Sequence, residues 1–491
     1  MCINTIKLIR EEGKKLYQSL NEELYLNHAG LKNKTALTQT LKSFRDLLEP
    51  EVFQSLLDAK PNTEEKSNGI KLIRAFLAET ILISKSPQIE DSILDIEASS
   101  IFAVGKSKIS FRKSKSALLT KSKKEETENI ENKRESVLAK LNQLYLRQYA
   151  YRQKDSHDLG YRSYLNLYEL LENHNSVDLA EKAKELIRDT EYISRDLLSW
   201  FMSKRMDIKL NNAGYKEMFY LLNSFELTEA FAKLNPHSLA KAILKETGIL
   251  LPAEIKFDTQ IRKGHISGSI SHLSNPGVEM LISTNLQGGI LDYESFLESF
   301  GESLCYGFTD RDDHFEYAYL RERSFVMTFS ILLKNLIFEP TWLKKHFRFD
   351  AESDFLKLIY LRRLIQLRIL CAKVIFEVAL YQRQDDKSEM YREIMEIATH
   401  CKPNKYEYLY DIQPHLSSLD SFKANMSETK LRAFLLENYD EQWWREQEAN
   451  DFLCKIWETG GRMSVSNLSD KCGFGNYSSN NLLQTFEEVL G

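Results

Sequence analysis

The sequence has few of the residues that make loops, disulfides or a surface of one charge. It contains 9 prolines and 19 glycines in 491 residues, which leaves little room for a β-sandwich or for long irregular loops. Its 6 cysteines include no Cys-x-x-Cys pair, which favours reduced thiols in the cytoplasm over a disulfide framework. The formal net charge of −5 gives no electrostatic reason to expect nucleic acid as a partner.

Long hydrophobic runs are also missing. No run of about 18 apolar residues occurs, so we expect no membrane span and no membrane partner. Charged residues interrupt residues 1–18, where a signal peptide would need an apolar stretch. The longest apolar stretch, 325–338, is broken by Lys334 and Asn335. The composition, 43% hydrophobic and 28% charged, is that of a globular protein, and we predict a cytoplasmic location.

Most of the chain shows the apolar spacing of α-helices. One example is 178–206, where Asp178 is placed to cap the N-terminus of a helix. We therefore predict a mainly α-helical protein with two regions. The first is an N-terminal helical region at 1–150, and the second is a larger helical domain at 151–491.

Two interruptions of the helical pattern predict strands. A β-hairpin around a glycine turn is expected near 100–111, and a small β-sheet is expected near 252–284. The sheet would contain three short strands, at 254–257, 268–271 and 278–283.

A helix expected after the sheet carries a row of acidic residues. Glu294, Glu298 and Glu302 are spaced four apart, so they lie on one side of the helix, next to an apolar stripe. Like charges at this spacing destabilise a helix by roughly 0.2–0.5 kcal/mol per pair. Taken alone, this pattern is typical of an amphipathic helix with a solvated acidic face.

Segments on both sides of this helix form an ordered set: Phe257 to Gly264, Asn275-Pro276-Gly277, Val278 to Ser283, Gln287-Gly288-Gly289, Asp292-Tyr293, Phe315-Glu316-Tyr317, Leu336 to Leu343, Leu431 to Tyr439 and Trp443-Trp444. In order and spacing they resemble the oligoendopeptidase F and thimet oligopeptidase superfamily of zinc metallopeptidases. The resemblance covers 158–490. It implies a gluzincin-like fold: a large two-lobed multi-helical peptidase, with a channel and a small antiparallel β-sheet before the zinc helix.

The resemblance also implies that the zinc site is lost. The family's helix carries His-Glu-x-x-His, in which two histidines hold zinc and the glutamate activates water. The histidine positions fall on Glu298 and Glu302, and the catalytic glutamate falls on Ser299. Gly301 keeps the family's glycine. The resemblance therefore implies that both zinc-binding histidines and the catalytic glutamate of the motif are replaced.

The remaining catalytic positions of the family are replaced as well. Its third zinc ligand, a glutamate on the next long helix, falls on Met327, which lies in an apolar context. Its late tyrosines, which stabilise the oxyanion, fall on Ser417 and Ser421. We expect no zinc, no other metal and no other cofactor.

These replacements predict a catalytically inactive, metallopeptidase-like protein that binds a peptide or protein partner in the former active-site channel. The family binds peptides along the edge strand before the zinc helix, here 278–283, because edge pairing needs only backbone hydrogen bonds. The peptide-binding candidates are Val278, Met280, Ile282, Gln287 and Gly288.

Two alternatives stay open. The first is a hydrolase or peptidase with a non-standard carboxylate site at Glu298 and Glu302, where burial in the channel could raise one pKa. Such carboxylates suit Mg²⁺, Mn²⁺ or Ca²⁺ better than zinc. The second is a purely structural interaction protein whose channel is filled with side chains.

Overall fold

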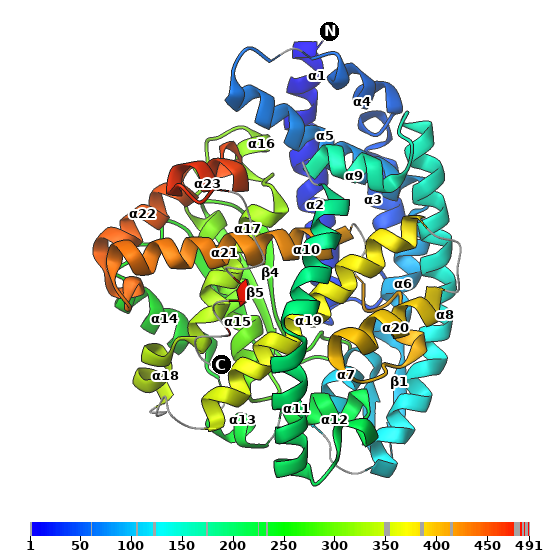
Figure 1. Cartoon of the computed structure of the whole chain (residues 1–491). Helices are drawn as coiled ribbons and strands as arrows, with labels where there is room; N and C mark the ends of the chain where they lie inside the picture. Colours follow the sequence, from blue (N-terminus) through cyan, green and yellow to red (C-terminus); the bar gives the residue numbers. More distant parts are fainter. Residues whose placement is uncertain are drawn as a thin grey trace.

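A computed structural model describes residues 2–59, 61–104, 107–120, 124–172, 175–223, 225–231, 234–347, 354–382, 387–412 and 416–475, and residues 482, 483, 486 and 490. The chain is mainly α-helical, as its apolar spacing predicts (Figure 1). Over these residues, no helix combines the length and apolarity needed to cross a bilayer.

The N-terminal third of the chain is a layer of helices with the hairpin at one end. β1 (Ile101–Val104) pairs antiparallel with β2 (Ser107–Ser110), which confirms the predicted hairpin, while its glycine turn lies outside the described residues. The helices of this layer are α1 (Cys2–Leu8), α2 (Lys14–His28), α3 (Leu37–Ser43), α4 (Pro50–Leu57), α5 (Glu64–Lys85), α6 (Pro87–Ser99), α7 (Phe111–Thr120) and α8 (Lys124–Asp158). Both α4 and α6 begin with proline, whose missing N–H costs no hydrogen bond at that position.

The predicted boundary near residue 150 falls inside α8, so the chain has no break there. One hydrophobic core runs from Ile9 in the first helices to Leu490 near the end of the chain. A smaller cluster around Phe102 and Phe111 supports the hairpin. The two predicted regions therefore share one core.

The middle of the chain consists of further helices, and one of them starts earlier than the sequence predicts. The cap of α10 is Asn175, whose side chain accepts a hydrogen bond of 3.0 Å from the Asp178 N–H, so the prediction of Asp178 as the cap is wrong. The predicted helix over 178–206 is interrupted at Thr190. The helices are α9 (Tyr164–Glu172), α10 (Ser176–Asp189), α11 (Glu191–Met206), α12 (Tyr215–Leu222), α13 (Phe225–Ala230) and α14 (Pro236–Thr247).

Three strands form the predicted small sheet, in the order β3-β5-β4. Their bounds are β3 (Glu254–Asp258), β4 (Gly268–Asn275) and β5 (Glu279–Asn285). β4 and β5 are antiparallel and joined by the predicted turn, whereas β3 pairs parallel with β5. The predicted edge strand 278–283 is therefore wrong, because β5 lies in the centre of the sheet with partners on both sides.

The rest of the chain is helical again, as predicted. The elements are α15 (Ile290–Gly307), α16 (Phe315–Ala318), α17 (Arg323–Lys334), the 3₁₀ segment η4 (Asn335–Phe338), α18 (Pro340–Phe347), α19 (Asp354–Gln382), α20 (Lys387–Thr399), the 3₁₀ segment η5 (Lys405–Glu407), α21 (Ser417–Tyr439), α22 (Gln447–Trp457) and α23 (Val465–Cys472).

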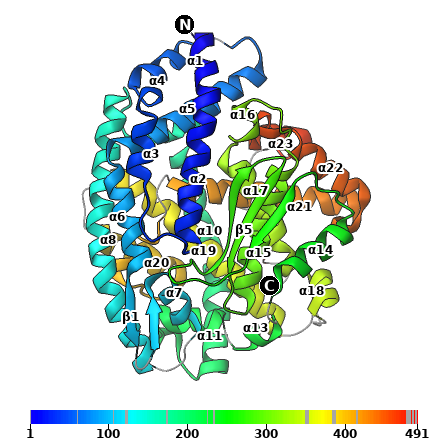
Figure 2. The ribbon, with the colours of Figure 1, turned by 180° about the vertical axis from the view of Figure 1, so that it is seen from behind.

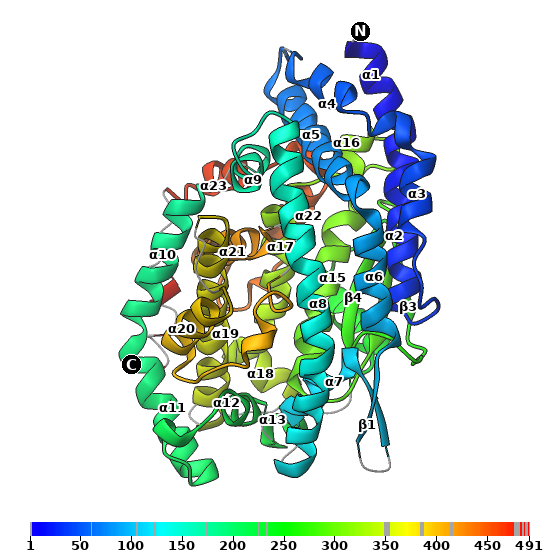
Figure 3. The same cartoon turned by 90° about the vertical axis from the view of Figure 1, so that its right-hand side faces the viewer.

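The helices surround a central unit made of the sheet, α15, α17 and α21. Seen from behind, the sheet lies beside α2, with α15 packed against it (Figure 2). From the side, α1, α2 and α3 form one flank of the molecule, and α10, α11 and α19 form the opposite flank (Figure 3). The site described below lies where α15, α17 and α21 meet α19.

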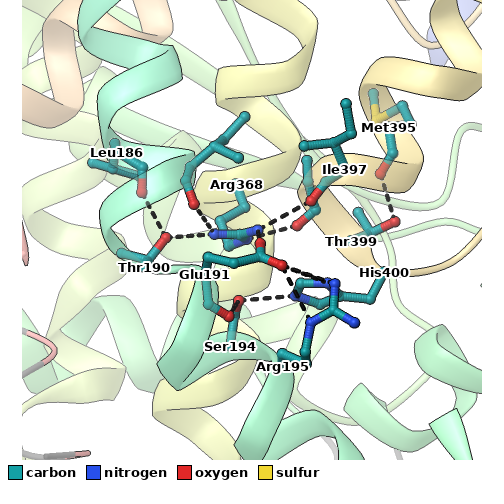
Figure 4. A network of polar contacts seen from close by, with 12 residues as sticks. Leu186, Thr190, Glu191, Ser194, Arg195, Arg368, Met395, Ile397, Thr399 and His400 are labelled. Carbon is teal, nitrogen blue, oxygen red and sulfur yellow. Dashed lines mark hydrogen bonds and ion pairs between the residues drawn. The ribbon is translucent and has the colours of Figure 1, made fainter.

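The buried side chain of Arg368 joins the helices of the flank that contains α10, α11 and α19 (Figure 4). The guanidinium of Arg368, on α19, donates to the Ala398 and Ile397 carbonyls at the end of α20, at 2.6 and 3.1 Å. It also donates to the Thr190 hydroxyl at 2.6 Å and to the Glu191 carboxylate at 2.8 Å, at the α10–α11 corner. Cations at helix C-termini are stabilising, so one side chain holds α10, α11, α19 and α20 together.

Candidate functional site

The predicted site lies on α15, and a glycine lets this helix pack closely against α17. A Cβ atom on Gly301 would come within 2.7 Å of the Phe329 carbonyl oxygen and 2.9 Å of the Ser330 Cα. Both distances are too short for a Cβ atom, so no residue with a side chain fits at this position. Gly301 is therefore required by the packing of α15 on α17, independently of the residues that flank it.

The loop before α15 is a fixed turn. Gly288 and Gly289 have φ values of +98° and +91°, which other residues rarely adopt. The carboxylate of Asp292 accepts hydrogen bonds from the backbone N–H groups of Gln287 (3.1 Å) and Gly288 (2.5 Å), and an anion is favourable in the first turn of a helix. The candidates Gln287 and Gly288 thus use their backbone donors within the protein and not toward a bound strand.

Glu298 and Glu302, the two residues predicted to replace the family's histidines, are carboxylates in different surroundings. Glu298 has a 49% exposed side chain, and its carboxylate lies 3.5 Å from the Lys334 ammonium. Glu302 is half-buried. Its burial, assisted by the nearby Glu298 carboxylate, raises the pKa of Glu302 to about 7. Ser299, at the position of the catalytic glutamate, is buried and has no carboxylate with which to activate water.

Two further predicted site residues, Met327 and Ser421, touch each other. The Ser421 hydroxyl lies 3.6 Å from the Met327 sulfur, and Ser417 is buried at the start of the same helix, α21. Glu322, the acid nearest to Met327 in sequence, cannot take its place. Its carboxylate accepts a hydrogen bond of 2.7 Å from the Lys423 ammonium, which holds it at the N-terminal end of α17.

This set of donors does not fit zinc. Catalytic zinc needs three nitrogen, sulfur or carboxylate ligands that converge on one point, whereas these positions supply a lysine-paired Glu298, a half-buried Glu302 and the neutral thioether of Met327. Within the described part of the chain, no three His, Cys, Asp or Glu side chains come together as a metal ion would require. No hydrolytic step through zinc follows from these residues.

A cavity of about 300 Å³ opens beside Glu298, between α15, α17, α19 and α21. It brings together three of the predicted residues: Glu298, Met327 and Ser421. Ser299, Glu302 and Ser417 are not among its lining residues. Apolar walls come from Ile331, Phe338, Leu367 and Leu370, and polar groups come from Lys334, Asn335, Arg363 and Gln366.

Two polar groups in this cavity have few partners. The side-chain Nδ2 of Asn335 is buried and makes no hydrogen bond. Arg363 forms only a 3.9 Å ion pair, with Glu428, although its side chain is just 11% exposed. Its guanidinium lies over the Phe338 ring, 5.2 Å from the centroid, and burial lowers its pKa. Because buried polar groups are nearly always satisfied, these two donors indicate a place for a ligand's acceptors.

The sequence contained a signal for these residues. Lys334 and Asn335 break the longest apolar stretch, 325–338. In a buried helix, such an interruption indicates a polar surface within the core. Arg363 carried no comparable signal, because it lies in a helix with several other charged residues.

The remaining peptide-binding candidates lie on or beside the central strand. Met280 and Ile282 are fully buried, and β5 is hydrogen-bonded to β3 and β4 on its two sides. The Val278 carbonyl accepts a 2.9 Å hydrogen bond from the Glu254 N–H. No added strand can pair here. β4 is an edge strand, but α2 flanks it, and the Gln18 amide donates to the Ser274 carbonyl at 3.5 Å.

Polar side chains also join the central unit to the helices around it. Arg323 on α17 pairs with Glu79 on α5 at 2.8 Å, and the Tyr168 hydroxyl on α9 donates to the Asp420 carboxylate on α21. Burial, with repulsion from Asp420, raises the pKa of Glu172 to about 8. These contacts tie α17 and α21 to α5 and α9.

A second cavity, of about 410 Å³, lies between α7, α8, α12 and η5, apart from α15. Several of its charged residues pair with one another. Asp411 accepts from Lys115 at 2.6 Å and from the Tyr391 hydroxyl at 2.9 Å, and Arg134 pairs with Glu407 at 2.6 Å. Because these charges are satisfied internally, the cavity beside Glu298 is the stronger candidate.

The fold matches known peptidases, although sequence comparison finds nothing. No family model matches the chain, and no curated protein matches it. Among solved structures, a PZ peptidase A with an inhibitor superposes with a TM-score of 0.69 at 14% identity, covering 92% of this chain and 86% of that one.

Two further structures agree with this match. A protein classed as an oligoendopeptidase F gives a TM-score of 0.68 at 13% identity over 99% of this chain and 91% of its own. The M32 carboxypeptidase of Deinococcus radiodurans gives 0.60 at 11% identity, over 99% and 100% of the two chains. The chain therefore has the helical fold of these metallopeptidases, and at this identity the likeness extends to the fold alone.

Proposed function

We propose that this protein is a catalytically inactive relative of these peptidases that binds a peptide, or a peptide segment of a protein, in the cavity beside Glu298. One observation carries the proposal. At the former ligand positions, Met327 contacts Ser421 and Glu298 pairs with Lys334, yet the space beside them stays open and is lined by Asn335, whose buried amide nitrogen has no hydrogen-bond partner.

The chemistry of the cavity suits a peptide. Its walls combine apolar side chains with the amide of Asn335 and the cations Arg363 and Lys334. A peptide supplies matching groups, namely apolar side chains, backbone carbonyls and carboxylates. Ligand sites of this kind have mostly apolar walls with a few convergent polar groups.

One observation favours the hydrolase alternative. A carboxyl group whose pKa is raised to about 7, as for Glu302, could act as a general acid or base near neutral pH. Against it, Glu302 is not among the residues that line the cavity, and its electrostatic neighbours include Tyr17, Cys305 and Tyr306. Inactive binding is therefore the better supported function.

Binding and turnover can be measured on the same peptides. Sixteen-residue peptides would be selected from a displayed library on the immobilised protein and resynthesised with a fluorophore and a quencher. We expect saturable binding without cleavage, with or without added zinc. Leu370→Trp, which fills the cavity, should weaken binding by about tenfold or more, or about 1.4 kcal/mol. Leu250→Trp is the matched control, because Leu250 is 89% exposed.

Cleavage would contradict the proposal. Turnover that persists in the wild type and is lost in Glu302→Gln would establish the carboxylate hydrolase instead. Binding that Leu370→Trp leaves unchanged would place the peptide elsewhere on the molecule.

A further inference from the structure

We propose that the free edge of β3 is a second docking site, which takes an extended, acidic peptide segment of a partner protein as an added strand. The site is a groove of about 670 Å³ between β3, α14 and α15. None of the described residues that line it also lines the cavity beside Glu298. The two sites are therefore separate, and binding at one of them can fail without the other.

The two edges of the sheet differ in what covers them. α2 packs along β4, where the Gln18 amide donates to the Ser274 carbonyl. α14 lies on the opposite side of the sheet from α2 (Figure 2). It touches β3 where the rings of His237 and Phe257 lie 4.5 Å apart, and the groove opens between the two elements. β3 therefore keeps an edge that an outside chain can reach.

The backbone of β3 has donors and acceptors to offer at this edge. The Glu254 N–H donates to the Val278 carbonyl at 2.9 Å, and β3 runs parallel to β5. Because the backbone groups of successive residues in a strand point to opposite sides, those of Ile255 and Phe257 point away from β5. Among the described residues, no backbone group pairs with either of them on this outer side. Such an edge of N–H and C=O groups is a template for an added strand.

The apolar side chains of β3 define one feature of the ligand. Ile255 and Phe257 are only half-buried, and both line the groove. Their partners in β5, Met280 and Ile282, are fully buried, so all four side chains lie on the core face of the sheet. An added strand continues this face, and every second side chain of the ligand then enters the groove, whose lining includes Phe300 of α15. The ligand therefore has apolar residues at alternate positions.

The charge of the groove defines a second feature of the ligand. Lys241 and Lys245 line it from α14, and both are exposed. Of the described residues that line the groove, none is acidic. The acid of the same helix, Glu246, pairs instead with Lys345 and His346. This charge favours a ligand that carries aspartate or glutamate, and it disfavours a second copy of the chain, which would bring its own lysines to a shared edge.

Binding is tested with a fluorescein-labelled heptapeptide in which glutamate and valine alternate, and with the same peptide carrying lysine in place of glutamate. Anisotropy should show saturable binding of the glutamate peptide, about tenfold or more tighter than binding of the lysine peptide. Ile255→Pro removes an outward N–H and breaks no hydrogen bond to β5, so it should weaken binding about tenfold or more. Lys241→Glu leaves the strand intact and should weaken binding about threefold or more. Lys140→Glu, the same change on an exposed position of α8, should bind like the wild type.

Hydrogen exchange shows whether the bound peptide pairs with β3. With the glutamate peptide bound, the Ile255 and Phe257 amides should exchange about tenfold or more slowly than in the free protein. Failure of the glutamate peptide to bind, binding that neither Ile255→Pro nor Lys241→Glu weakens, or unchanged exchange at these two amides would overturn the proposal. A dimer in sedimentation that Ile255→Pro dissociates would also overturn it, because the edge would then belong to a second copy of the chain.

Discussion

Helix α19 carries two buried arginines five residues apart, and they lie in opposite kinds of surroundings. Arg368 is completely buried, and each of its three guanidinium nitrogens donates at 2.8 Å or less to α10, α11 or α20 (Figure 4). Arg363 is nearly as buried, but its closest acid is 3.9 Å away, and its guanidinium lies over aromatic rings at the cavity.

This difference indicates that Arg368 stabilises the fold and that Arg363 is available to bind a ligand. A buried cation is tolerated when hydrogen bonds replace the water that it has lost. Arg368 meets this condition within the protein, whereas Arg363 meets it only in part. We infer that the face of α19 with Arg368 holds the fold together and that the face with Arg363 receives a ligand.

The largest effect expected is the loss of stability on replacing Arg368. Arg368→Met removes the donor to the Ala398 and Ile397 carbonyls and leaves the Glu191 carboxylate with Arg195 alone. Breaking one side of such a buried network costs about 3–5 kcal/mol. Urea unfolding followed by circular dichroism measures the change.

Arg363→Met is the matched comparison on the same helix. It removes a cation whose closest acid is 3.9 Å away, and Glu428 keeps Arg432 at 3.4 Å, so we expect a smaller loss of stability than for Arg368→Met, because no close hydrogen bond is broken. It should nevertheless weaken binding of an acidic peptide. Equal losses of stability in the two variants would contradict the division of α19 into two faces.

A smaller effect concerns Glu302, which also lies near the former zinc position. Its folded pKa of about 7 exceeds that of an unfolded glutamate, so the folded chain holds a proton that the unfolded chain releases between about pH 4.5 and 7. The stability contributed by Glu302 is therefore fully present below pH 4.5 and is lost as the pH rises through 7.

Replacing this carboxyl with an amide should remove the pH dependence. We expect Glu302→Gln to be more stable than the wild type at pH 8, by about 1–2 kcal/mol, and nearly unchanged at pH 4.5. Denaturant melts at the two pH values measure this. Glu185→Gln, on an exposed position of α10, is the control. A stability difference independent of pH would mean that the carboxyl titrates normally.

Much of the fold could be predicted from local patterns. The hairpin, the strands around 252–284 and the long helices follow from alternation, turn residues and three-to-four spacing, and the resemblance to the peptidase superfamily fits the matched folds. The order of the strands in the sheet could not be predicted, because it depends on whether β3 pairs with β4 or with β5. The expected edge position of 278–283 was wrong for that reason.

The site was predictable only in part. Glu298, Met327 and Ser421 do meet, although they are distant in sequence. Arg363 and Phe486 reach the same cavity through tertiary packing, which leaves no local pattern in the chain. The spacing between Glu298 and Glu302 does not show whether Glu302 faces this cavity. The helices packed against α15 decide which residues of its acidic row are covered.

The most direct test of the account is the metal content of the purified, untagged protein after dialysis against equimolar zinc and manganese. Mass spectrometry of the metals should give a stoichiometry near zero, because Glu298, Glu302 and Met327 do not supply three zinc ligands that converge on one point. About one metal ion per chain, lost in the double variant Glu298→Ala/Glu302→Ala, would contradict the account and establish a rebuilt metal centre.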